Sequence, residues 1–344
     1  MPTSTERRIL QERRAKKSGA ILVPILEELL ELDSSTGPST PDDFRFMDML
    51  IKARALPRRK GVFSPSMLGS CVRQAYFAKR NVEKHSAGNP QTHGYFLNGN
   101  FVHLKWQYLL WRGHINDKLE LVPIPIEHEL DLLDDLVSAK TITKEQRKVW
   151  ASALNFYGDG TRPAVEVRVV NEDFGGTIDG MIRVPPYKKN VKVHVIDFKG
   201  INVIDFQRTI KRGAKTEYRV QLVGYGENVN VSDLPYEVAD CLLVSENKAG
   251  PTNSSSASPI ALHETKVTIE DHLHEVKRRL KTLRWYDSRN ELPPAECIST
   301  THMGYQECPF NRFCYDEVRA TQRKRQLKAA KEPKRELKVA RPTR

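Results

Sequence analysis

Residues Val193 to Gly200 place an acid and a base inside an otherwise largely apolar segment. The order Val-His-Val-Ile-Asp-Phe-Lys-Gly is typical of a strand that is covered on both faces. Residues two apart in a strand share a face, so Asp197 and Lys199 should point to the same side. Two charges on a covered face are costly unless they form an ion pair, accept hydrogen bonds or bind a metal. The segment therefore predicts a central strand with a polar site near its end.

A second acid, Asp179, lies 18 residues earlier in the run Gly-Thr-Ile-Asp-Gly. This run belongs to a predicted strand from Thr177 to Val184, and two adjacent strands would bring Asp179 close to Asp197 and Lys199. Carboxylate oxygens suit Mg²⁺ or Mn²⁺, and such a cation assists hydrolysis of a phosphodiester by neutralising developing charge and by generating hydroxide. Lys199 would then steady the phosphate or the attacking water. The structural alternative is an Asp-Lys ion pair at a strand end and a turn aspartate.

Two predicted helices carry further candidates. Gln221 and Tyr225 are four residues apart and therefore fall on one face of a helix from about 217 to 227. His103 lies in Gly-Asn-Phe-Val-His, within a predicted helix from about 98 to 111. Each also has a structural explanation, because a histidine among apolar neighbours is usually a hydrogen-bonded core residue and Tyr225 could pack on a sheet.

In their order along the chain, these motifs resemble the RecB-like branch of the PD-(D/E)xK nucleases. The likeness spans residues 61 to 318, and many relatives carry Glu where this chain has Asp197. It implies a site for Mg²⁺ or Mn²⁺ whose ligands are His103, Asp179, Asp197 and the main-chain carbonyl of Phe198. It also implies that Lys199 is the catalytic lysine, and that Gln221 and Tyr225 position the DNA end or brace the site.

Four of the five cysteines flank the segment that carries these motifs: Cys71 precedes it, and Cys297, Cys308 and Cys314 follow it. Four thiolates can hold either zinc or an iron-sulfur cluster. The same distribution resembles that of CRISPR-associated RecB-type exonucleases and of the AddB nuclease domain, which implies a 4Fe-4S cluster. Zinc is the alternative occupant. The structural alternative is that the four cysteines are unrelated buried thiols that bind no metal. Cys241 is interpreted as an ordinary core thiol on a strand.

The net charge of +12 is concentrated at the two ends of the chain. Residues 319–344 hold eleven Lys and Arg against two Glu, and residues 1–17 hold six against two, so the remainder is close to neutral. These ends could bind phosphates without reading sequence, or they could be solvated arms. We find no stretch long and apolar enough to cross a membrane and no secretion signal, and we expect a cytoplasmic protein.

The sequence predicts an α/β fold with a restriction-endonuclease-like core, in which a central mixed β-sheet is flanked by helices. We expect a helical N-terminal extension over 1–60, a nuclease domain over 61–318 that is closed by the cysteine-rich segment, and a disordered basic tail over 319–344. Strands are predicted at 165–169, 177–184, 191–200 and 237–245. Helices are predicted at 7–17, 21–32, from 40 onward, and at 64–79, 98–111, 203–211, 217–227 and 268–286, with a Ser-rich loop at 250–258.

The resemblance implies a metal-dependent DNA exonuclease that acts on single-stranded ends in DNA recombination, repair or replication, and that is encoded by a phage. The chain lacks the phosphate-binding motif G-x-x-x-x-G-K-[ST], so any unwinding would come from a separate helicase or recombinase. Two alternatives stay open. One is a structure-selective endonuclease of the same fold, and the other is a non-catalytic DNA-end-binding adaptor with a structural metal cluster. The sequence does not determine the oligomeric state.

Overall fold

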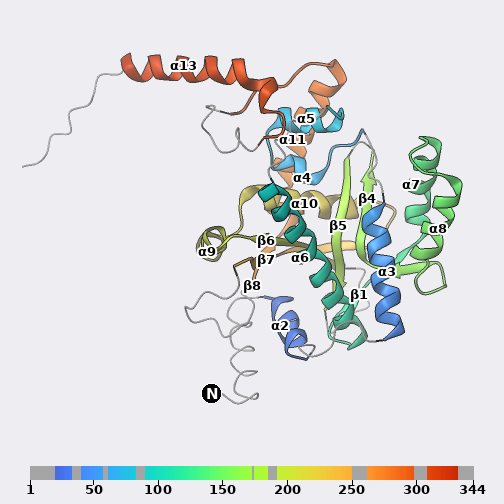
Figure 1. Ribbon diagram of the computed structural model, residues 1–344. Helices are drawn as coiled ribbons and strands as arrows, with labels where there is room; N and C mark the ends of the chain where they lie inside the picture. The colour runs from blue at the N-terminus through green and yellow to red at the C-terminus, as the bar shows by residue number, and fades with distance from the viewer. Residues whose placement is uncertain are drawn as a thin grey trace, which may run out of the picture.

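A central sheet with helices on both sides organises the computed structural model of the chain (Figure 1). The residues that the structure describes are 20–32, 40–56, 61–82, 90–172, 174–184, 192–249, 262–297 and 308–331, with the backbone alone for 90–99 and 325–331. Within these ranges no helix is both long and apolar enough to span a membrane. The predicted helix at 7–17 and the Ser-rich loop at 250–258 lie outside the described residues.

The main sheet has six strands, five of which follow the order β1-β5-β6-β7-β8, while β4 pairs with β5. Pairing is antiparallel between β5 and β6, parallel between β6 and β7, and antiparallel between β7 and β8. The predicted mixed α/β architecture is therefore confirmed. The strands are β1 (Glu120–Leu121), β4 (Val165–Asn171), β5 (Phe174–Arg183), β6 (Lys192–Ile201), β7 (Glu237–Asn247) and β8 (Leu262–Val267).

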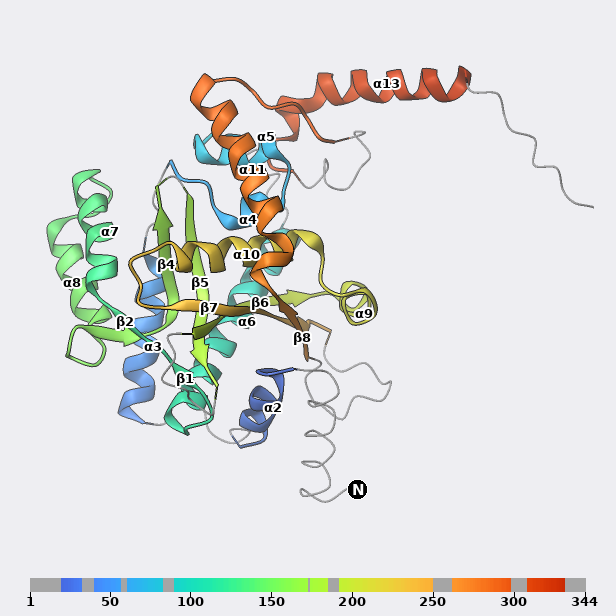
Figure 2. The ribbon, with the colours of Figure 1, turned by 180° about the vertical axis from the view of Figure 1, so that it is seen from behind.

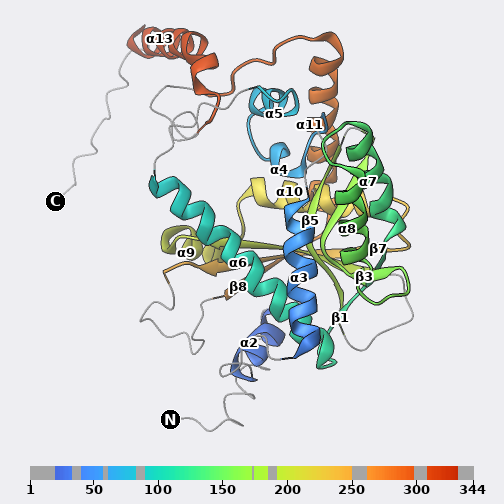
Figure 3. The same cartoon turned by 45° about the vertical axis from the view of Figure 1, so that its right-hand side comes forward.

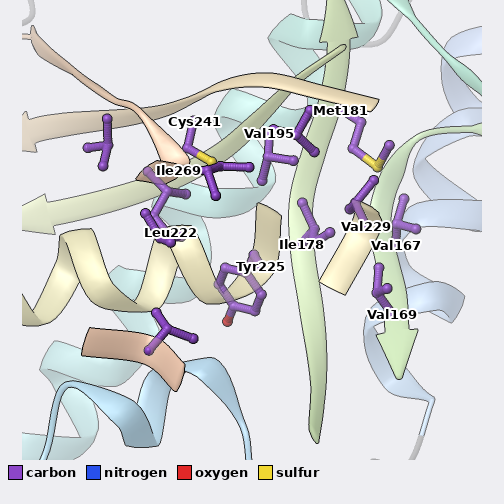
Figure 4. Packing of buried hydrophobic residues seen from close by; sticks show 14 of the residues in the cluster. Val167, Val169, Ile178, Met181, Val195, Leu222, Tyr225, Val229, Cys241 and Ile269 are labelled. Carbon is purple, nitrogen blue, oxygen red and sulfur yellow. The ribbon is translucent and has the colours of Figure 1, made fainter. Parts of the chain in front are cut away.

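Helices cover both faces of this sheet because its strands present apolar side chains in both directions. One face packs against α2 (Val23–Leu32), α3 (Pro41–Ala55) and α6 (Pro90–Ile115), where Trp106 is completely buried. The other face packs against α10 (Thr216–Asn230) and α11 (Ile269–Arg289), which Figure 2 shows from behind. Figure 4 shows part of this second core, in which Val195 of the sheet lies near Leu222 and Tyr225 of α10.

A helical pair beside β4 was not predicted from the sequence. It consists of α7 (Glu127–Ser138) and α8 (Lys144–Leu154), and a small antiparallel sheet of β2 (Pro123–Pro125) and β3 (Thr161–Pro163) connects it to the core. Figure 3 shows the pair at the edge of the molecule. Its base contains an ion pair between Arg162 and Glu129, both almost completely buried.

The remaining helices are α4 (Pro65–Leu68), α5 (Val72–Lys79), α9 (Val203–Arg212), the 3₁₀ turn η1 (Asn311–Cys314) and α13 (Tyr315–Lys331). The single helix predicted at 64–79 is thus two helices, which are separated at Gly69. A Cβ at Gly69 would lie 2.8 Å from the main-chain oxygen of Glu217, so the close approach of α10 explains the glycine. The first residues of the predicted basic tail, 319–331, belong to α13. Residues 332–344 lie outside the described part.

Candidate active site

The site forms where β5 and β6 diverge. Their backbone pairing runs from Ile182↔His194 to Gly180↔Ile196, and Asp179 is the next residue of β5 beyond it. The main-chain nitrogen of Phe198 on β6 donates a hydrogen bond to Asp179 Oδ2 at 2.7 Å. The carboxylate thus takes the place of a strand partner and is fixed beside β6, opposite Asp197.

Asp197 and Lys199 share the face of β6 that packs on α10, as predicted. Lys199 Nζ lies 2.7 Å from Asp197 Oδ2 and donates to Oδ1 at 2.9 Å. Gln221 Nε2 lies 3.4 Å from the same Oδ1 and donates to the Tyr225 hydroxyl at 3.2 Å. Burial raises the pKa of Asp197, although the ammonium of Lys199 opposes this shift. Burial would lower the pKa of Lys199, but the carboxylates of Asp197 and Asp179 outweigh it and raise that pKa.

His103 approaches from the opposite side, on α6. Its Nδ1 lies 2.9 Å from Asp179 Oδ1. Burial alone would raise the pKa of Asp179 and lower that of His103, but the attraction between the two groups is stronger. The pKa of Asp179 is consequently lowered and that of His103 is raised, which favours an imidazolium-carboxylate pair.

All six side chains that the sequence singled out around this site line one cavity of about 520 Å³: His103, Asp179, Asp197, Lys199, Gln221 and Tyr225. The side chain of Phe198 points away from it, toward α6, and stacks on Trp106 with ring centroids 6.1 Å apart. The structure therefore brings these residues together, although the role of each remains a prediction, including that of the Phe198 carbonyl.

Sequence reasoning missed part of the cavity wall. Arg54, Asn100 and Glu166 also line it, and Gln107 lies behind it and bonds to Glu166. Glu166 occupies a polar position between two valines, a pattern typical of a half-exposed strand, yet it is only 8% exposed. Arg54 comes from α3, in the segment that was interpreted as an extension. Only the packing of α3 against the sheet reveals its place.

The donor set fits Mg²⁺ or Mn²⁺, since it offers two carboxylates and one imidazole. Within the described residues, however, no three His, Cys, Asp or Glu side chains are arranged to hold a metal ion as they stand. The four oxygens of Asp179 and Asp197 instead contact nitrogen atoms of His103, Phe198 and Lys199. A cation would have to displace the His103 proton and loosen the Lys199 pair.

The four flanking cysteines gather at a second place, next to α5. Burial, together with the charges of Cys71, Cys308 and Cys314, raises the pKa of Cys297 to about 11, so the four thiols are close enough to interact electrostatically. The buried Arg73 donates a hydrogen bond to Cys314 Sγ at 3.6 Å. The fifth cysteine, Cys241, is fully buried in the core on β7, as predicted.

Fold and cavity together define the class of this protein: a mixed α/β protein with an acid- and lysine-lined cavity where two central strands diverge. No protein-family model matches the sequence, and no curated protein is significantly similar to it.

Several solved structures resemble the chain, including the following three. One is a crystal structure of SSO0001, with 12% identity, a TM-score of 0.36, and coverage of 81% of this chain and 98% of that one. The second is an alkaline exonuclease (LHK-Exo) from Laribacter hongkongensis, with 17% identity, a TM-score of 0.26, and coverage of 46% and 81%. The third is LHK-Exo in complex with dAMP, with 17% identity, a TM-score of 0.25, and coverage of 46% of this chain and 82% of that one. At these scores the likenesses carry no functional argument.

Proposed function

We propose that this protein is a metal-dependent DNA exonuclease that hydrolyses phosphodiester bonds at single-stranded ends. The observation that carries the proposal is the convergence of His103, Asp179, Asp197 and Lys199 on one cavity. These residues come from one helix and two strands, and they combine cation-binding groups with a partly buried ammonium. A purely structural ion pair between Asp197 and Lys199 would need neither the second carboxylate nor the imidazole.

The chemistry follows from the charges. Asp179, Asp197, His103 and the Phe198 carbonyl would hold Mg²⁺ or Mn²⁺, which supplies hydroxide at neutral pH and neutralises charge on the phosphate. Lys199, once released from Asp197, can donate to a phosphate oxygen or to the attacking water. Gln221 and Tyr225 hold the Asp197 side of the cavity in place through their mutual hydrogen bond.

The size of the cavity favours a single strand as substrate. A volume of about 520 Å³ can admit one nucleotide of a single strand. Such an enzyme would serve DNA recombination, repair or replication. A separate helicase or recombinase would supply the single-stranded ends.

We propose that the cysteines hold a 4Fe-4S cluster, with zinc as the competing occupant. The thiols interact electrostatically, yet no three are arranged to hold one metal ion in the described part of the chain. The choice of a cluster over zinc rests on the distribution of the four cysteines along the chain, one before and three after the segment that carries the motifs, because four thiolates could hold either group. The guanidinium of Arg73 would offset part of the negative charge of the thiolates.

The test is one anaerobic preparation that is assayed in two ways. A visible spectrum and metal analysis distinguish iron and sulfide from zinc. Linear end-labelled single-stranded DNA, with Mn²⁺ or EDTA, should be degraded from an end only with Mn²⁺, and Asp197→Ala should abolish this while its circular dichroism is unchanged. Closed circular single strands should persist. Their cleavage would indicate an endonuclease, and binding without degradation would indicate the adaptor.

A further inference from the structure

Glu166 is a third acid in the cavity wall, and none of the motifs of the site includes it. On β4 it stands between Val165, which pairs with Gly180, and Val167, which pairs with Ile178, so it lies opposite Asp179 on β5. It is only 8% exposed and lines the same cavity. A carboxyl at this depth must be placed there by the fold, because burying a charge without a partner is costly.

The backbone at Glu166 is strained, and its conformation directs the side chain into the cavity. Its φ is +50°, a left-handed conformation that a non-glycine residue rarely adopts within a strand. As a consequence Val165 packs with the α6 core and Val167 with the α10 core, although residues two apart in a strand normally share a face. The alternation predicted for 165–169 is thus broken at Glu166. Strain of this kind persists where surrounding contacts impose it, and it is concentrated at functional sites.

Those contacts connect Glu166 to Asp179. The buried Gln107 on α6 donates from its Nε2 to Glu166 Oε1 at 2.8 Å and to the main-chain oxygen of Asp179 at 3.0 Å. One amide group therefore bridges the third acid and the backbone of a proposed metal ligand. Arg54 of α3 adds an ion pair to the same Oε1 of Glu166.

The two acids also interact through their charges. Burial raises the pKa of Glu166, and the neighbouring Asp179 raises it further, while Arg54 opposes both. A divalent cation placed against Asp179 would relieve this repulsion. The cation would compete with His103 and Lys199 for the oxygens of Asp179 and Asp197. A negative charge at Glu166 would attract the cation and so favour it in this competition.

We infer that Glu166 is a positioning residue of this site, which fixes Asp179 through Gln107 and strengthens the binding of a divalent cation by its charge. The inference rests on the proposed function, since it assigns Glu166 a part in the same cation site. It extends the acidic wall from two strands to three. The strained conformation of β4 at Glu166 then has a functional role, because it directs a carboxylate into the cavity.

Two variants separate the charge from the bridge. Glu166→Gln removes the negative charge but keeps an oxygen that can accept from Gln107. Gln107→Leu keeps the charge but removes the bridge at nearly constant volume. The control is Glu172→Gln, which removes one carboxylate from the same β4–β5 hairpin, at a residue with the same φ of +50° and an exposed side chain paired with Arg284.

The measurement is Mn²⁺ binding to the full chain without DNA, by isothermal titration, together with DNA degradation over a range of Mn²⁺ concentrations. For Glu166→Gln we expect a Kd for Mn²⁺ about tenfold weaker, and a rate within about threefold of wild type once Mn²⁺ saturates. For Gln107→Leu we expect the rate at saturating Mn²⁺ to fall about tenfold, because Asp179 is less firmly held. Glu172→Gln should match the wild type in both measurements.

The outcomes distinguish this inference from the proposed function. If the wild type degrades DNA and Glu166→Gln binds Mn²⁺ with unchanged affinity, the inference is overturned and the nuclease stands. A Glu166→Gln variant with lower thermal stability but normal Mn²⁺ affinity would likewise overturn it, because Glu166 would then serve only as the partner of Arg54. If the wild type binds Mn²⁺ but leaves DNA intact, and Glu166→Gln weakens that binding, the inference holds and the nuclease proposal fails.

Discussion

At the scale of single residues, Lys199 has two functions that one substitution can separate. In the structure its ammonium neutralises Asp197, and in the proposed reaction it would contact the phosphate. Lys199→Met keeps the aliphatic stem and removes the charge. We expect degradation of DNA to fall by at least about a hundredfold, because the stabilising ammonium is lost, while Mn²⁺ binds more tightly since no cation competes for Asp197.

Titration calorimetry with Mn²⁺ and single-turnover digestion of end-labelled DNA check this prediction. Lys199→Arg is the matched control, because it restores the charge with a different shape, and it should return Mn²⁺ affinity toward wild type without full activity. Wild-type activity in Lys199→Met would show that the ammonium only balances Asp197.

Gly176 shows how closely α10 approaches the site. A Cβ built at this position would lie 2.7 Å from Tyr225 Cε1 and 2.9 Å from Pro65 Cδ. Gly176→Ala should therefore overpack this contact, lower the free energy of unfolding by about 1–3 kcal/mol and reduce activity by displacing Tyr225 from Gln221. Urea denaturation and DNA digestion measure the two effects, and a variant that matches wild type in both would mean that the helix can move away without cost.

The sequence predicts residues of this site where a motif breaks the pattern of its element. Asp197 and Lys199 are charges in an apolar strand, and they are noticed for that reason. Glu166 escapes notice because it conforms to the alternation of an exposed strand, and only its positive φ and the helices over β4 make it an interior residue. Gln107 escapes notice because a glutamine in a helix is ordinarily a solvated residue.

At the scale of secondary-structure elements, a buried ion pair holds the α7–α8 pair to the core. Arg162 and Glu129 are each 1% exposed, and Arg162 also donates to main-chain oxygens of Pro163 and Val165. Arg162→Met would leave Glu129 buried without its partner. We expect the free energy of unfolding to fall by about 3–5 kcal/mol.

Arg147→Met is the comparison within the same helical pair. Arg147 joins α8 to Asp134 of α7, but this pair lies at the surface, with Arg147 28% and Asp134 56% exposed. Its loss should cost less than about 1 kcal/mol. Equal effects of the two substitutions in chemical denaturation would contradict the assignment of Arg162 as the anchor of this pair.

The elements predicted from the sequence are those with a strong pattern and a clear end. Thr40 caps α3 at the predicted helix start, with Pro41 in the first turn, and β6 differs from its predicted range by one residue at each end. The pair α7–α8 was missed although α7 is amphipathic, because no strand pattern in β2 or β3 marks where it joins the sheet. Strands of two or three residues, such as β1 to β3, are defined by their partners rather than by their own sequence.

At the scale of the whole molecule, the four gathered cysteines connect the beginning of the core to its end. Cys71 directly precedes α5 near the start, whereas Cys314 ends η1 just before α13, more than two hundred residues later. A metal centre that closes a loop of this length removes much conformational freedom from the unfolded chain. The segment from 308 to 314 has little core of its own, and Phe310 is its main buried side chain.

Cys314→Ala should therefore remove the cluster and its visible absorbance, lower Tm, and expose the C-terminal segment to proteolysis before the rest of the chain. Cys241→Ala is the control, because it also removes one buried thiol, but from the sheet core, away from the four gathered cysteines. It should lower Tm modestly while the absorbance and the iron content remain. Spectra, iron analysis and limited proteolysis of the two anaerobically purified variants decide the matter. If Cys314→Ala retains its colour and its protease resistance, the C-terminal segment is held by Phe310 and Arg73 alone.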